Sequence, residues 1–76
     1  MTRGDILYNQ RNGQSGIFLS PIGQRYLSVI VFERVGDTIR KRSRTTWMRD
    51  HVRGDGTWGM EIVDAAKTMA KEVMGE

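Results

Sequence analysis

Arginine and aromatic side chains are concentrated in the middle of the sequence, between residues 25 and 58. Proteins that hold single-stranded nucleic acid use this mixture, because cations follow the phosphates while aromatic faces stack on unpaired bases. The alternative is that the rings form the core and the arginines form a solvated face. The candidate nucleic-acid contacts are Arg25, Tyr26, Phe32, Arg34, Arg40, Lys41, Arg42, Arg44, Trp47, Arg49 and Trp58.

Other patterns that could perform chemistry are weaker. Gly54, Gly56 and Gly59 have the spacing of a dinucleotide-binding loop but lack the surrounding βαβ unit, so a hairpin turn with glycines at positive φ explains them better. His51 is the only histidine, and the chain has no cysteine. We therefore expect no metal site, no cofactor and no enzymatic activity.

The composition indicates one small domain with a basic surface. The chain has 76 residues, 38% of them apolar, and a net charge of +3. A domain of this size buries only about 60% of its unfolded surface, so a partner chain or nucleic acid is expected to support it. No apolar run approaches the roughly 20 residues that span a bilayer. We expect no membrane contact and an intracellular location, in the cytoplasm, nucleoid or nucleus, or in a host cell if the protein is viral.

The elements that must position the candidate residues are three or four antiparallel strands followed by one helix. Residues 1–15 are rich in turn formers and are interpreted as a flexible N-terminal arm, which leaves residues 16–76 as the binding domain. The predicted strands span residues 16–20, 26–32 and 38–48, with a turn at 20–23, a loop from 49 to 59 and a brief strand near 58–62. Both faces of the strand 26–32 are apolar, so both are expected to be covered.

Alternation along residues 38–48 places the basic side chains together. Arg40, Arg42 and Arg44 form one stripe, with Ile39 and Trp47 on the opposite face, unless a β-bulge shifts the phase.

The end of the chain has the apolar spacing of an amphipathic helix from Ile62 to Met74, with Gly75 placed to stop it. Its apolar stripe is wider than one small sheet requires. Two interpretations are therefore open: part of the stripe contacts a second copy of the chain in a dimer, or the whole stripe packs on the chain's own sheet. The residues of this predicted interface are Ile62, Val63, Ala66, Met69, Ala70, Val73 and Met74.

The order of several short patterns resembles the positive-cofactor-four family of transcriptional coactivators. These patterns are Ile22-Gly23 followed by Arg25-Tyr26-Leu27-Ser28-Val29, then Phe32, then Arg44-x-x-Trp47-Met48, then Gly56-x-x-Gly59 leading into Ile62 and a helix. The resemblance covers about two-thirds of the chain, and it is the order and spacing of the pieces that carries it.

The resemblance implies an α+β fold, a four-stranded antiparallel sheet followed by a C-terminal helix, paired through the helices into a homodimer that binds single-stranded DNA. By position, it implies that Phe32 and Trp47 stack on bases and that Arg44 contacts phosphate. The expected function is sequence-tolerant binding of single-stranded DNA in transcription, replication or recombination, beside proteins of those processes. Two alternatives are a small inhibitor or interaction module that uses its basic face on an acidic protein, and a sheet domain that reads double-stranded DNA.

Overall fold

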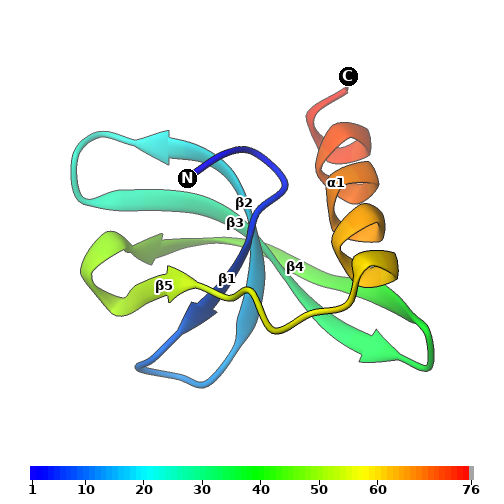
Figure 1. The fold of residues 1–76 in the computed structure, drawn as a ribbon. Helices are drawn as coiled ribbons and strands as arrows, with labels where there is room; N and C mark the ends of the chain where they lie inside the picture. The colour runs from blue at the N-terminus through cyan, green and yellow to red at the C-terminus, as the bar shows by residue number, and fades with distance from the viewer. Residues whose placement is uncertain (76) are drawn as a thin grey trace.

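The computed structural model describes residues 1–75, which form an α+β fold with a five-stranded antiparallel sheet and one C-terminal helix (Figure 1). Within these residues, no helix has the length and apolar content needed to cross a membrane. The strands are β1 (Ile6–Asn9), β2 (Ser15–Ile22), β3 (Tyr26–Val35), β4 (Thr38–Met48) and β5 (Val52–Gly54), a 3-10 turn η1 (Arg49–His51) joins β4 to β5, and the helix is α1 (Met60–Met74).

The sheet curls strongly, and its connectivity explains why. The strand order is β4-β3-β2-β1-β5, so β4 and β5 lie at opposite edges although only η1 separates them in the chain. Four chain steps from Met48 to Val52 span at most about 14 Å. The edges of a flat five-stranded sheet are about 19 Å apart. The sheet must therefore bend back on itself to bring its two edges together.

Each face of the curled sheet packs a separate apolar cluster, as the pattern of strand 26–32 predicts. Successive residues of β3 alternate between the two clusters, which confirms that both faces of this strand are covered. Helix α1 covers the first cluster, and the curl of the sheet encloses the second. The first contains Ile6, Ile17, Leu19, Ile30, Phe32, Ile39, Ile62, Ala66 and Ala70, and the second contains Leu7, Phe18, Leu27, Val29, Val31 and Trp47.

The predicted flexible arm over residues 1–15 is wrong, and with it the domain boundary at residue 16. β1 lies inside the sheet between β2 and β5, and its residue Leu7 is completely buried. The turn-forming residues that suggested an arm instead form the β1–β2 hairpin. There the buried Asn9 accepts a hydrogen bond from the backbone N–H of Arg11 (2.9 Å), and Gly13 adopts a φ of 73°.

Several other bounds differ from the expectation, whereas β4 has the predicted bounds. β2 continues to Ile22, through most of the predicted turn at 20–23, β3 continues to Val35, and α1 starts two residues before Ile62. The fifth strand is Val52–Gly54, and no strand forms near residues 58–62, because the chain turns there and starts α1 at Met60 with Gly59 as its N-cap. None of the three glycines in this loop has a positive φ, so the turn explanation given for them is also wrong. Gly75 ends the helix in the left-handed conformation, as predicted, with a φ of 74°.

Candidate nucleic-acid interface

The basic residues of β4 lie on an open edge of the sheet. β4 is an edge strand, and every residue from Arg40 to Thr46 is exposed. The cationic segment is therefore accessible, but its arrangement is different from the predicted single stripe.

A β-bulge at Arg42 divides the predicted stripe. Val31 pairs with Ser43 and Phe32 pairs with Lys41, so Arg42 has no partner of its own on β3. On one side of the bulge, Arg40 forms an ion pair with Glu33, and Arg42 Nη1 lies 3.9 Å from the other carboxylate oxygen of Glu33.

Beyond the bulge, Arg44 faces the helix. Its Nη2 donates to the Sδ atom of Met74 at 3.9 Å, which connects β4 to the last turn of α1. The three arginines therefore do not form one row. The bulge also explains why Ile39 and Trp47, which strict alternation places on one face, belong to opposite clusters.

Phe32 and Trp47 are core residues, so the expectation that their rings are exposed to bases is wrong. Each has only 5% of its surface exposed. The ring of Trp47 reaches across β3 to Gly16 on β2, so closely that a Cβ atom at Gly16 would lie 2.7 Å from the ring. Phe32 is covered by Trp58, whose ring meets it edge-on with the centroids 5.4 Å apart.

Two of the candidate aromatic residues retain accessible surface. Trp58 is half-buried in the loop before α1, and Tyr26 at the start of β3 is 44% exposed. They lie at different ends of the long strands β3 and β4.

Trp58 is held in place by Asp55. The indole Nε1 of Trp58 donates to Asp55 Oδ2 at 3.0 Å, while the other carboxylate oxygen accepts from the hydroxyl of Thr57 at 2.6 Å and from its backbone N–H at 3.1 Å. The pKa of Asp55 is lowered, chiefly by the Thr57 hydroxyl and also by the Thr57 N–H, Trp58 and Arg53. The carboxylate is thus charged at neutral pH and fixes the orientation of the indole.

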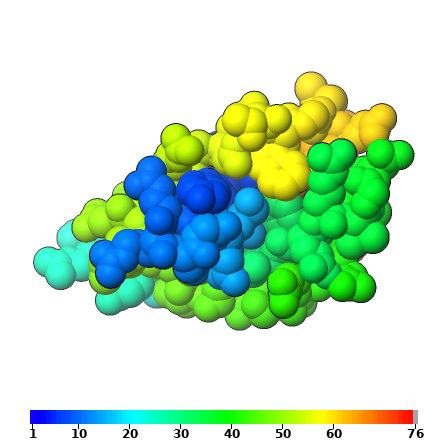
Figure 2. Space-filling model, turned by 90° about the horizontal axis from the view of Figure 1, so that it is seen from below, coloured from blue at the N-terminus to red at the C-terminus, as the bar shows by residue number. Residues whose placement is uncertain are grey.

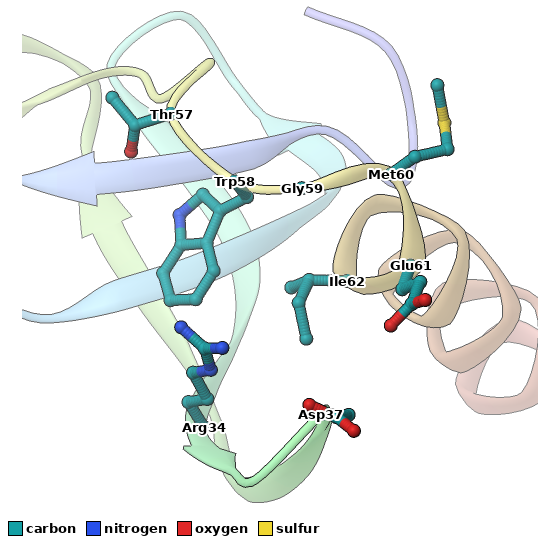
Figure 3. A pocket seen from close by; sticks show the side chains of 8 residues that line it. All are labelled: Arg34, Asp37, Thr57, Trp58, Gly59, Met60, Glu61 and Ile62. Atoms are coloured by element: carbon teal, nitrogen blue, oxygen red, sulfur yellow. The ribbon is translucent and has the colours of Figure 1, made fainter.

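Trp58 and Arg34 separate two adjoining hollows. In Figure 3 the guanidinium of Arg34, from β3, and the ring of Trp58 point toward one another. The larger hollow, of about 600 Å³, is lined by Arg34, Asp37, Thr57, Trp58, Gly59, Met60, Glu61 and Ile62, and the smaller, of about 270 Å³, by Gly13, Gln14, Ser15, Val31, Phe32, Arg34, Arg42 and Trp58. We call the two hollows together the Trp58 groove.

The two halves of the Trp58 groove have different electrostatics. Asp37 and Glu61 contribute carboxylates to the larger hollow, whereas the only charged residues of the smaller one are Arg34 and Arg42. In Figure 2 the segment that carries Trp58 (yellow) lies between the β1–β2 hairpin (blue) and the β3–β4 hairpin (green). The smaller hollow therefore offers an aromatic ring, two guanidinium groups and polar side chains to a planar anionic ligand.

A second set of candidates lies at the β2–β3 turn. Arg25 and Arg49 are both exposed, and the backbone N–H of Arg49 donates to the carbonyl of Arg25 at 2.7 Å. Tyr26 is paired with Ile22 on one side and Met48 on the other. The accessible candidate residues therefore lie at two sites, the Trp58 groove and the β2–β3 turn. Lys41 and Arg44 lie on β4 between these two sites.

The residues of the predicted dimer interface face the chain's own sheet. Ile62, Ala66 and Ala70 are buried in the first cluster, and Val63, Met69, Val73 and Met74 are half-buried against it. The apolar stripe of α1 thus packs over its full width on the sheet of the same chain. Dimerisation stays a prediction that light scattering can test.

Within residues 1–75, no group of three or more His, Cys, Asp or Glu side chains is placed to share a metal ion. A scan of protein-family models, a search of curated proteins and a search of solved structures each find no match to this chain. The resemblance to the positive-cofactor-four family stays a prediction, and the site is interpreted from its geometry.

Proposed function

We propose that the domain binds single-stranded nucleic acid, with DNA as the expected form, in the Trp58 groove and with little sequence preference. The observation that carries the proposal is the smaller hollow, where a half-buried indole fixed by Asp55 lies beside Arg34 and Arg42 with no carboxylate in the lining. An unpaired base would stack on the indole, and its flanking phosphates would contact the two guanidinium groups.

The proposal of weak sequence preference follows from the groups available. Stacking uses the π-face that every base has, and guanidinium contacts to phosphate carry no sequence information. Gln14 and Ser15 add hydrogen-bonding side chains at the rim. Duplex DNA offers its phosphates but keeps its bases stacked on one another, so a duplex would use only the electrostatic part of the site.

A fluorescence-anisotropy titration tests the proposal. Labelled dT12 and a labelled 12-base-pair duplex are titrated with the protein at several salt concentrations. We expect tighter binding of dT12, and a plot of log K against log salt with a slope of about −0.7 for each phosphate neutralised. Arg42→Ala should make this slope less steep, whereas Lys71→Ala, which removes an exposed cation from α1, should not change it.

Equal or tighter binding of the duplex would favour the double-stranded reader and contradict the proposal. Failure to bind either DNA at low salt would also contradict it.

One observation favours an acidic protein partner as a second candidate. β4 is an edge strand of eleven residues whose middle is cationic and exposed, which could pair with an acidic strand of another protein. A β-bulge, such as that at Arg42, and exposed cations are also the usual protection of an edge strand against such pairing. Competition of poly-glutamate with dT12 at matched charge concentration separates the two candidates, because stacking on Trp58 requires bases.

A further inference from the structure

A second accessible aromatic patch lies at the far end of the β3–β4 pair from the Trp58 groove. We call it the Tyr26 patch, and its residues are Ile22, Arg25, Tyr26, Met48 and Arg49. Ile22 and Tyr26 are 47% and 44% exposed, which is unusual for large apolar residues in this chain. Because directly paired residues of neighbouring strands share a face, Ile22, Tyr26 and Met48 form one row across β2, β3 and β4.

The Tyr26 patch, like the smaller hollow, contains two arginines. Arg25 and Arg49 are exposed, lie next to Tyr26 and Met48 in the chain, and are joined by the hydrogen bond from the Arg49 N–H to the Arg25 carbonyl; the exposed Asp50 follows Arg49. An accessible aromatic ring with two exposed arginines nearby therefore occurs twice in this small domain, once at Trp58 and once at Tyr26. The repeated combination suits the same ligand chemistry at both places.

The two places are connected by β4. The β2–β3 turn and the β3–β4 turn lie at opposite ends of the molecule (Figure 1), and the exposed run from Arg40 to Thr46 lies between them on the open edge. Trp58 packs on Phe32, which lies six positions after Tyr26 on β3. At about 3.3 Å per residue this is about 20 Å, or about six nucleotides at a stacked rise of 3.4 Å.

We infer that the Tyr26 patch is a second contact point for the same single strand, which follows the β4 edge from Trp58 to Tyr26. The inference rests on the proposed function and adds the length of strand that the domain recognises. A strand long enough to span both places binds at two linked points, and the second contact is then intramolecular. Affinity should rise with strand length up to about six nucleotides and change little beyond it.

The test compares Tyr26 variants on a short and a long strand, dT3 and dT12, followed by tryptophan fluorescence and by anisotropy respectively. Tyr26→Ala should weaken dT12 binding by about fivefold to 150-fold, the range expected for one stacked base, and leave dT3 binding at Trp58 unchanged. Tyr26→Phe keeps the ring and should restore dT12 binding. Because Tyr26 lies partly exposed at the end of a strand, thermal unfolding should show that both variants stay folded.

Each result decides between the inference and the proposed function. If the wild-type protein binds neither strand, the proposed function fails. If the wild-type protein binds dT12 and Tyr26→Ala does not change that affinity, the proposed binding in the Trp58 groove is retained and the second contact at Tyr26 is overturned. Equal weakening of dT3 and dT12 also overturns the inference, because Tyr26 would then belong to the primary contact. A dimer in light scattering that Tyr26→Ala dissociates would assign the patch to a second copy of the chain and overturn the inference as well.

Discussion

The two tryptophans of this chain have the same chemistry and opposite roles in the fold. Trp47 lies on β4, has 5% of its surface exposed and reaches across the sheet to Gly16. Trp58 lies in a loop, is half-buried and is held by a hydrogen bond to Asp55. A ring on a strand of a strongly curled sheet thus becomes enclosed, while a ring on a loop that a hydrogen bond holds in place can stay open to a ligand.

The largest expected effect is the loss of stability when Trp47 is truncated. Trp47→Ala removes a buried ring from the second cluster and should cost about 3–5 kcal/mol of unfolding free energy. A 76-residue domain has about 4–11 kcal/mol in total, so the variant should be largely destabilised. Urea unfolding followed by circular dichroism measures this. Trp58→Phe is the control and should shift the midpoint much less; a stable Trp47→Ala would mean that the ring is not a core residue.

Gly16→Ala tests the close approach of Trp47 to β2. The added Cβ would meet the ring at 2.7 Å, and such overpacking typically costs about 1–3 kcal/mol. Gly54→Ala is a matched control on β5, because a Cβ there meets no atom within 4 Å. Thermal unfolding should show a Tm below that of the wild type for Gly16→Ala and not for Gly54→Ala. Similar Tm values would contradict the enclosed position of Trp47.

Truncation of the second ring should act on binding. Trp58→Ala is expected to weaken binding of dT12 by about 1–3 kcal/mol, the range measured for one base stacked on an aromatic ring. Because Trp58 also covers Phe32, Trp58→Phe is measured beside it, as it keeps an apolar ring over the core while losing the hydrogen bond to Asp55. Anisotropy titrations at one salt concentration give both affinities. Unchanged affinity in a folded Trp58→Ala variant would remove the groove as the binding site.

The smallest expected effect concerns Asp55, whose carboxylate accepts the hydrogen bond from the Trp58 indole. The pKa of Asp55 in the folded chain is lowered from its ordinary 3.8. The stability that its charged form supplies is therefore complete above that value and is lost as the pH falls through the lowered pKa. The Tm of Asp55→Asn should lie below the wild-type Tm at neutral pH, and the difference should be smaller at a pH below 3.8. A Tm difference that is the same at both pH values would show that the carboxylate charge plays no part.

The strands and the helix were predictable where a single segment carries its own pattern. β4 has the bounds expected from its Thr, Ile and Trp content, and the apolar spacing after Ile62 identifies α1. β1 was missed because four residues are too few for a periodic signal, and its burial depends on pairing with β2 and β5. Pairing of this kind is a property of the whole sheet and is not visible in one segment.

The candidate site was predictable in composition and not in arrangement. The mixture of arginines and aromatic rings selects the region that contains the Trp58 groove, but the bulge at Arg42 decides which side chains share a face. One inserted residue reverses the alternation, so Trp47 is assigned to the enclosed face and Arg44 to the helix. The hydrogen bond from Trp58 to Asp55 has a weak sequence signal, an Asp three residues before a Trp in a glycine-rich loop.

The placement of β1 between β2 and β5 also sets the order in which the chain can fold. The strands β1 to β4 pair as hairpins between neighbours in the sequence. The outer edge of β1 is paired only when β5 has been synthesised, because Leu7 on β1 lies opposite Gly54 on β5. On a ribosome, the loop with Trp58 and then α1 emerge later still. A nascent chain that ends near residue 48 would therefore expose the open edge of β1 and the uncovered first cluster, and both features favour aggregation.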